Sequence, residues 1–572
     1  MSRGAGSSMV EAIWFGEPGS TSFGMFHRPQ GAVRAGIVIC PPLGLEGISA
    51  HATLRTLAER LVAQHFAVLR LDYPGTGDAG DVRNTDGHLH SWVSSVDGAL
   101  GLLADAGAPR LAVVGMRMGA LLAACTHAVE PLAAAVLWDP PVSGRAFLRE
   151  QRALSMLSHG ASSAGTGDLE APGFVYGADT VAEMHRLAYP AKPVASRVLV
   201  LTRPGASAPA LGDAWSPHLE HDVADGQAAL LNVNSENSVI PAGTAARIAR
   251  WVDSVLPATN QVSGKTGDQL ELPPVGRLAH DQGGRRIVER ACHLGPSKLF
   301  AIACEPDGPV NGPTVVFLNV AAEPHIGPAR QWVTLSRSLA AAGRRAVRVD
   351  LSGLGESPCR QGAAPGIYLS ADAIDDATDT ARALSAEDPT DVVFVGLCSG
   401  ASMAIEAALA LRARGVCVIN PPFQYAPPEW RRGARGVDPR RRAWYPRRGL
   451  FRYVDNRPRW HFLRAAVPGW VWHLLDLTGL QAAPTRGLAA LVGQGTGVVM
   501  VCARADLAPY EQMAPWALRR LRGNRAFEVS VIPGLDHSQL IRGPRQAASE
   551  LIEDHLLADP RMGVRGQYRA VR

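Results

Sequence analysis

The sequence predicts an α/β protein with two tandem domains, each a mostly parallel sheet flanked by helices. The chain has 572 residues, whereas one α/β domain commonly needs about 250. Apolar strand-like runs alternate with amphipathic helical stretches, which is typical of βαβ units with helices on both faces of a sheet. The pattern of the first half also recurs in the second, and 47% hydrophobic residues suffice for two cores.

The internal repeat orders the elements. The segment EAIWFGEPGSTSFGMFHRP from Glu11 is matched by ERACHLGPSKLFAIACEP from Glu289, an offset of 278 residues. The same offset aligns DYPGTGD from Asp72 with DLSGLGES from Asp350. We predict that Asp350 belongs to a tight, non-catalytic turn. Each half then continues with a strand (LAVVG or DVVFVG), a helix rich in Ala and Leu, and another strand (AAAVLWDPP or GVCVINPP).

Four segments follow from this repeat. We predict a first domain over 1–257 and a second domain over 276–558. Residues 258–275 are polar and rich in Gly and Pro, which is typical of a linker. Residues 559–572 form a basic tail.

Composition excludes several classes of protein. No apolar run approaches the ~18 residues of a spanning helix, and the first residues lack the pattern of a secretory signal, so we expect a soluble, cytoplasmic protein. The eight cysteines form no CxxC pair, so the sequence predicts no disulfide framework, metal site or cofactor. The net charge of +5 is concentrated in one segment and matches no nucleic-acid-binding module, so no nucleic-acid partner is predicted.

A reactive cysteine is predicted in the second half. The strand DVVFV runs directly into Gly396-Leu397-Cys398-Ser399-Gly400, and a helix follows. Flanking glycines allow a strained, tight turn that leaves the central side chain projecting above the sheet. The N-terminus of the following helix favours a thiolate over a thiol at Cys398.

The order of elements, the turn at Asp350 and this elbow resemble the α/β-hydrolase superfamily over nearly the whole of both halves. The Cys elbow resembles those of polyhydroxyalkanoate synthases and dienelactone hydrolases, and the strand pattern resembles serine aminopeptidase-like members. The resemblance implies Cys398 as nucleophile, His537 as general base and Asp506 as the acid that orients the imidazole. It also implies an oxyanion hole made by the backbone N–H of Ser399 and that of Val320 or Ala321.

Two other assignments remain open for these segments. Ser399 is an alternative nucleophile, although it lies one residue past the apex of the turn. Asp536 is an alternative acid, although its place beside His537 favours a loop-capping role.

The first half has lost all three chemical positions. Its elbow carries Arg117, and its acid and His positions are Ala206 and Asn237, with the same spacing of 31 residues as Asp506 and His537. Because a guanidinium stays protonated and cannot attack a carbonyl, we predict a catalytically inactive copy. Arg117 either binds a carboxylate or phosphate, or is anchored by a local acid or carbonyl.

The resemblance implies a cap over the second site, at about 421–490. Its stretch 429–464 contains twelve arginines and three acidic residues, a local charge of +9. Interleaved arginines and aromatic residues could clamp an anionic acyl donor, such as a coenzyme A or acyl-carrier-protein thioester. The candidate contacts are Arg431, Arg432, Trp444, Arg447 and Trp460. The alternatives are that this stretch is a solvent-exposed face of the cap or that it contacts anionic lipid head groups.

The sequence therefore predicts a hydrolase or acyltransferase that acts on an ester or thioester through an acyl-Cys intermediate. An acyl-Cys is itself a thioester and reacts readily with amines and alcohols, so transfer is a serious alternative to hydrolysis. The competing class is a non-catalytic scaffold or binding protein.

Overall fold

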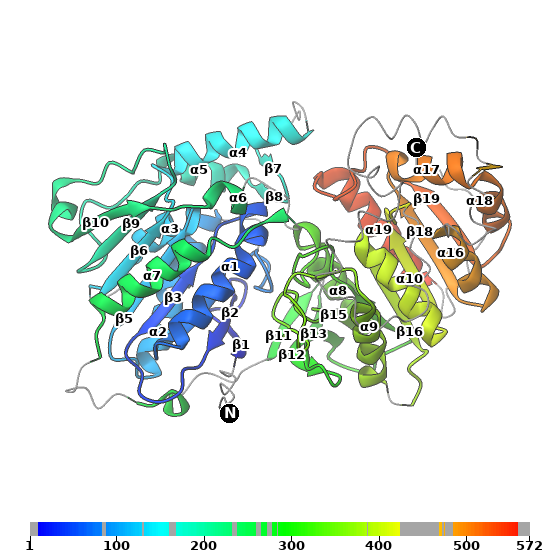
Figure 1. Ribbon diagram of the computed structural model, residues 1–572, viewed down its shortest axis with the longest axis horizontal. Coiled ribbons are helices and arrows are strands. Elements are labelled where there is room, and N and C mark those ends of the chain that lie inside the picture. The colour runs from blue at the N-terminus through cyan, green and yellow to red at the C-terminus, as the bar shows by residue number, and fades with distance from the viewer. Residues whose placement is uncertain are drawn as a thin grey trace. The chain divides into compact units, whose positions relative to one another are not determined.

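The computed structural model describes residues 10–82, 87–127, 131–159, 167–231, 237–258, 265–270, 277–282, 284–385, 387–423, 468, 470–471, 474 and 484–558. The chain divides into two compact units, Met1–Leu278 and Ala279–Arg572 (Figure 1). Residues 265–270, inside the range predicted as a linker, lie on the first unit. The Gly267 N–H donates to Gly31 O at 2.8 Å, and Leu270 is buried in the core of that unit.

The first unit is built on an eight-stranded sheet with the order β1-β2-β4-β3-β5-β6-β9-β10. The pairs β1–β2 and β2–β4 are antiparallel, and all later pairs are parallel. Its strands are β1 Val10–Phe15, β2 Ser22–His27, β3 Gly36–Cys40, β4 Ala67–Asp72, β5 Leu111–Met116, β6 Ala134–Trp138, β9 Val198–Thr202 and β10 Leu219–Val223. A separate hairpin consists of β7 Leu169–Ala171 and β8 Phe174–Tyr176.

The second unit repeats this arrangement in a nine-stranded sheet with the order β11-β12-β13-β15-β14-β16-β17-β18-β19. The pairs β12–β13 and β13–β15 are antiparallel, and the pairs from β15 onward are parallel. The strands are β11 Arg277–Gln282, β12 Arg285–Leu294, β13 Leu299–Pro306, β14 Thr314–Phe317, β15 Ala346–Val349, β16 Val392–Leu397, β17 Gly415–Ile419, β18 Gly497–Cys502 and β19 Phe527–Val531.

Helices cover both faces of each sheet. The first unit has α1 Leu45–Val62, α2 His88–Asp105, α3 Met118–Ala124, α4 Gly144–His159, α5 Ala178–Arg186, α6 Gln227–Leu231 and α7 Ala242–Val255. The second has α8 Gln331–Ala341, α9 Ala371–Leu384, α10 Ser399–Leu411, α16 Pro484–Gly493, α17 Arg504–Met513, α18 Pro515–Arg522 and α19 Arg542–Ala558.

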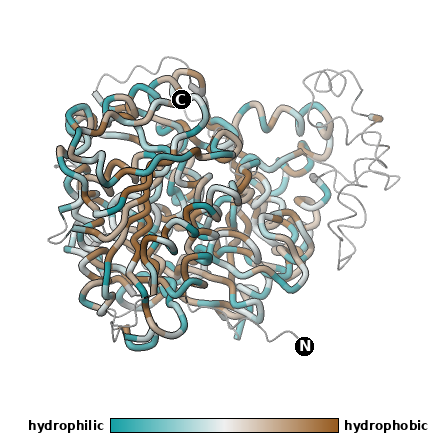
Figure 2. The backbone as a smooth tube through the Cα atoms, turned by 60° about the vertical axis from the view of Figure 1, so that its left-hand side comes forward, coloured by the Kyte–Doolittle hydropathy of each residue, from teal (hydrophilic) through white to brown (hydrophobic). Residues whose placement is uncertain are grey.

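Each sheet is therefore buried on two sides. Successive strand residues point to opposite faces, so Val38 packs with α2 and α3 while Ile37 packs with α1 and α7. In the second unit the equivalent layers contain α9 and α10 on one face and α8 and α19 on the other. Figure 2 shows the hydrophobic residues concentrated along the strands.

The predicted fold class, two tandem sheets that are mostly parallel and flanked by helices, is confirmed. Most of the predicted cap at 421–490 and the whole of the predicted tail at 559–572 lie outside the described residues. Among the residues that the structure describes, no helix is long and apolar enough to cross a membrane.

Candidate functional site

The predicted elbow is a strained turn between β16 and α10. Cys398 has φ 52° and ψ −116°, a left-handed conformation that side chains rarely adopt, and it is the N-cap of α10. A Cβ atom at Gly396 would collide with the carbonyl oxygen of Gly400, and one at Gly400 with that of Asn319. The two glycines are therefore needed for the close passage of the chain that presents Cys398.

The structure brings Cys398, His537 and Asp506 together. The His537 Nε2 atom lies 3.1 Å from Cys398 Sγ, and His537 Nδ1 lies 2.7 Å from Asp506 Oδ1. Asp506 is in the first turn of α17, directly after β18, and His537 is in the loop between β19 and α19. Three loops at the carboxyl ends of parallel strands thus supply one contiguous hydrogen-bonded chain.

The hydrogen bonds among Cys398, His537 and Asp506 favour a charged imidazole at His537. The hydrogen bonds to Asp506 and Cys398 raise the pKa of His537 to about 10, although partial burial opposes the charge. An imidazole with this pKa holds a proton at neutral pH, and its Nε2–H can then pair with a thiolate at Cys398.

The two predicted oxyanion donors are linked to each other. The N–H of Ala321 donates to the side-chain Oγ of Ser399 at 2.8 Å, while Val320 is packed into the core beneath. Ala321 itself has a left-handed φ of 48°. The Ser399 hydroxyl thus accepts the hydrogen bond of one predicted oxyanion donor, the N–H of Ala321. His537 contacts Cys398 rather than Ser399.

A buried network, which the sequence analysis missed, holds the loop after β14. Asp350 accepts hydrogen bonds from the Asn319 side chain at 2.8 Å and from the His325 backbone at 2.7 Å, and its Oδ2 lies 2.7 Å from His325 Nδ1. Burial opposes ionisation of Asp350, but the His325 imidazole and these donors hold its pKa below its usual range. Asp350 therefore positions the loop that contains Ala321.

Asn420, also missed, joins the acid and His loops. It follows β17 with φ 42° and is fully buried. Its Oδ1 accepts from Ala503 N at 2.7 Å, at the start of α17, and its Nδ2 donates to His537 O at 2.9 Å. The only sequence signal was its place in INPP, directly after a strand.

Asp536 caps the turn beside the site. Its carboxylate accepts from the backbone N–H groups of Leu540 at 3.0 Å and Ile541 at 3.1 Å. Asp506, not Asp536, contacts the imidazole.

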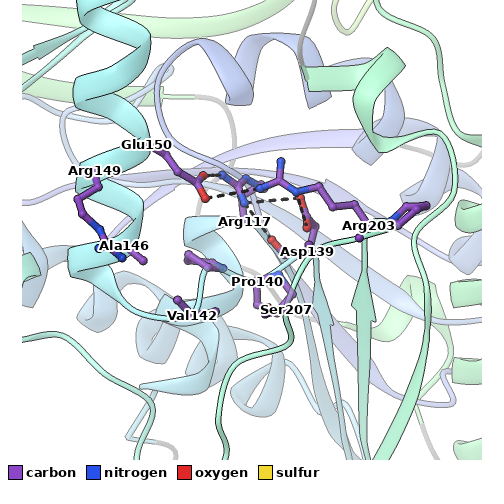
Figure 3. Close-up of a pocket in the computed structure, with 13 residues that line it drawn as sticks. Arg117, Asp139, Pro140, Val142, Ala146, Arg149, Glu150, Arg203 and Ser207 are labelled. Atoms are coloured by element: carbon purple, nitrogen blue, oxygen red, sulfur yellow. Dashed lines mark hydrogen bonds and ion pairs between the residues drawn. The ribbon is translucent and has the colours of Figure 1, made fainter.

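The elbow of the first unit keeps the geometry and changes the chemistry. Arg117 has φ 54° and ψ −124°, close to the values of Cys398. Its guanidinium is bound by Glu46 at 3.1 Å, by Asp139 at 3.5 Å and by Glu150 (Figure 3). Burial opposes its charge, but these carboxylates raise the pKa of Arg117 above its usual range. Of the two roles open to Arg117, the structure places it in the one anchored by local acids.

The other two degenerate positions are separated. Ala206 lines a cavity of about 520 Å³ beside Arg117, whereas the exposed Asn237 is not among the lining residues. The cap candidates Arg431, Arg432, Trp444, Arg447 and Trp460 lie outside the described residues. Within the described ranges, no group of three or more His, Cys, Asp or Glu side chains is placed to hold a metal ion.

The comparisons with known proteins each cover less than half of the chain. Residues 310–550 match the alpha/beta hydrolase family. The solved structures similar to this chain include Est1E from Butyrivibrio proteoclasticus, with 14% identity over 43% of this chain and 100% of that chain and a TM-score of 0.31. The Pyrococcus furiosus esterase Pf2001 has 14% identity, 44% and 94% coverage and a TM-score of 0.31. A dienelactone hydrolase from Anabaena variabilis has 14% identity, 49% and 96% coverage and a TM-score of 0.27. No curated protein matches the sequence.

Proposed function

We propose that the second unit, in which residues 310–550 match the alpha/beta hydrolase family, is an enzyme in which the Cys398 thiolate attacks the carbonyl of a small ester or thioester. The observation that carries this proposal is the chain of contacts from Cys398 Sγ through the His537 imidazole to Asp506, at 3.1 and 2.7 Å. This is the arrangement of an activated nucleophile, its base and the group that orients the base.

Acylation follows from these contacts. The sulfur of Cys398 forms a bond to the carbonyl carbon, and the carbonyl electron pair moves onto oxygen. When that pair returns, the bond to the leaving oxygen or sulfur breaks, and the imidazolium of His537 gives its Nε2 proton to the leaving group. In the second stage the neutral imidazole removes a proton from water or another acceptor, which attacks the acyl-Cys; the bond from the carbonyl carbon to sulfur breaks, and the Cys398 thiolate is restored beside the protonated imidazole.

The developing oxyanion needs backbone donors near the elbow. The N–H of Ser399, at the start of α10, faces no earlier turn of its helix and is one such donor. The N–H of Ala321 is the other, and the hydroxyl of Ser399 that it now contacts must rotate away or be displaced by the substrate oxygen. Ser399 therefore acts on the oxyanion and not as nucleophile.

The acceptor decides between hydrolysis and acyl transfer. We propose acyl-coenzyme A or acyl-carrier-protein thioesters among the donors, because the arginine-rich stretch 429–464 is close in sequence to Asn420. The first unit carries Arg117 where the nucleophile stands, and we propose that it is catalytically inactive.

Intact-protein mass spectrometry after exposure to a nitrophenyl ester and to an acyl-coenzyme A tests this function. We expect an acyl adduct on Cys398, lost in Cys398→Ala and retained in Ser399→Ala. Cys359→Ala is the matched control, because Cys359 is an exposed cysteine outside the site. An adduct that persists in Cys398→Ala, or the absence of any adduct and turnover with both donors, would contradict the proposal.

A further inference from the structure

The first unit has a cavity at the place where the second unit has its nucleophile. Its volume is about 520 Å³, within the range of small-molecule sites. Arg117 follows β5, Asp139 follows β6, and Arg203 and Ala206 follow β9, while Glu150 of α4 closes the other side. In α/β proteins, ligands bind beyond the carboxyl ends of the parallel strands, where this cavity lies.

The floor of the cavity offers no available charge. The side chain of Arg117 is only 3% exposed and its nitrogens are bound by Glu46, Asp139 and Glu150. Figure 3 shows Arg117, Asp139, Glu150 and Arg203 pointing toward one another, whereas Arg149 lies apart from them on α4. A ligand would therefore find its charged partners elsewhere on the wall.

Two guanidiniums on the wall retain donor capacity. Arg203 is 33% exposed and lies 3.6 Å from Asp139 and 3.5 Å from Glu150, ion pairs that make no hydrogen bond. Arg149 is exposed, and in the described part of the chain it has no ion pair or hydrogen bond. Each guanidinium has five N–H donors in a planar fork that matches a carboxylate.

The remaining wall is apolar and carries no nucleophile with a base. It is formed by Pro140, Pro141, Val142, Ala146, Pro204 and Ala206. Ser207 supplies a hydroxyl, but no imidazole or thiol is among the lining residues. A molecule bound here would be held without being converted.

We propose that this cavity binds a small organic monocarboxylate, with its carboxylate on Arg203, its apolar body against the prolines, and Arg149 as a second positive charge on the wall. Arg117 is already bound by Glu46, so the charged groups left on the lining are the two guanidiniums of Arg149 and Arg203 and the carboxylates of Asp139 and Glu150. A phosphate dianion would meet more repulsion from Asp139 and Glu150 than a singly charged carboxylate would, which favours the carboxylate. The inference does not depend on the activity of the second unit.

Calorimetric titration of the full-length protein with octanoate, and with uncharged octanamide, tests the site. We expect octanoate to bind and octanamide to bind at least about tenfold more weakly, since an unpaired guanidinium contact of 1.4 kcal/mol corresponds to tenfold. Arg149→Gln and Arg203→Gln should each weaken octanoate binding at least about tenfold. Arg145→Gln is the matched control, because Arg145 is an exposed arginine of α4 that does not line the cavity.

Two further variants locate the binding. Val142→Trp should fill the cavity and abolish octanoate binding, and Val142 is 42% exposed, so the larger side chain does not disturb the core. Cys398→Ala should leave binding unchanged. Equal binding of octanamide, retention of affinity in both arginine variants, or loss of binding in Cys398→Ala would overturn the proposal, as would no binding of octanoate at all.

Discussion

Cys398 should stay reactive in mildly acidic solution, where ordinary thiols do not. Its Sγ lies 3.1 Å from an imidazole whose pKa is raised to about 10, so that imidazole stays charged at every pH between 5 and 8. A thiolate beside it is stabilised over the same range. An isolated thiol with a pKa of about 8.5 loses about 100-fold of its thiolate between pH 7 and pH 5. For Cys398, whose sulfur contacts this imidazole, we expect the alkylation rate to fall less than that of an isolated thiol.

Iodoacetamide labelling followed by peptide mass spectrometry measures this at each cysteine of one sample. In the wild type, labelling of Cys398 should slow less between pH 7 and pH 5 than labelling of the exposed Cys359. Cys417, whose pKa burial raises to about 12, should remain unlabelled. In His537→Gln, Cys398 should follow the profile of Cys359. A wild-type Cys398 that already slows in parallel with Cys359 would refute the thiolate–imidazolium pair.

Three other substitutions probe the surroundings of the two elbows. Asn420→Ala leaves backbone groups of two loops unpaired, so chemical denaturation should show a loss of roughly 2–4 kcal/mol, with slower labelling of Cys398. Arg117→Met leaves buried carboxylates without their cation and should lower the free energy of unfolding by roughly 3–5 kcal/mol at neutral pH. The loss should be smaller in acid, because the carboxylates are then protonated. The folded pKa of His537 lies above its ordinary 6.5, so its contribution to stability is complete below pH 6.5 and is lost as the pH rises towards about 10. In Asp506→Asn this pH dependence, measured by denaturation between pH 6 and 10, should flatten.

Much of the fold was predictable because its strands are buried on both faces and read as apolar runs. The offset of 278 residues aligns Gly36 with Thr314, and these residues begin β3 and β14. The hairpin β7–β8 and the edge strand β11 were not predicted. Their strands are short or lie next to the Gly- and Pro-rich segment, so their sequences carry no strong periodicity.

The site was predictable only where function fixes a local pattern. The glycines around Cys398 mark the turn, and Asp506 and His537 follow their strands in the expected order. Asn420 has no such mark, because its hydrogen bonds reach residues 83 and 117 positions away. The contact between Ser399 and Ala321 likewise spans 78 positions and depends on how two loops pack.

The two elbows also separate backbone strain from chemistry. A left-handed conformation at a residue other than glycine costs of order 1–3 kcal/mol. Arg117 nevertheless adopts it with φ 54°, as Cys398 does with φ 52°. The residues after β6 and β17 differ in step with this: the left-handed Asp139 pairs with Arg117, whereas Asn420 binds two loops with a neutral amide. The strained turn is thus retained because it aims a side chain at the loops beyond the sheet. What that side chain does depends on whether it meets one imidazole or three carboxylates.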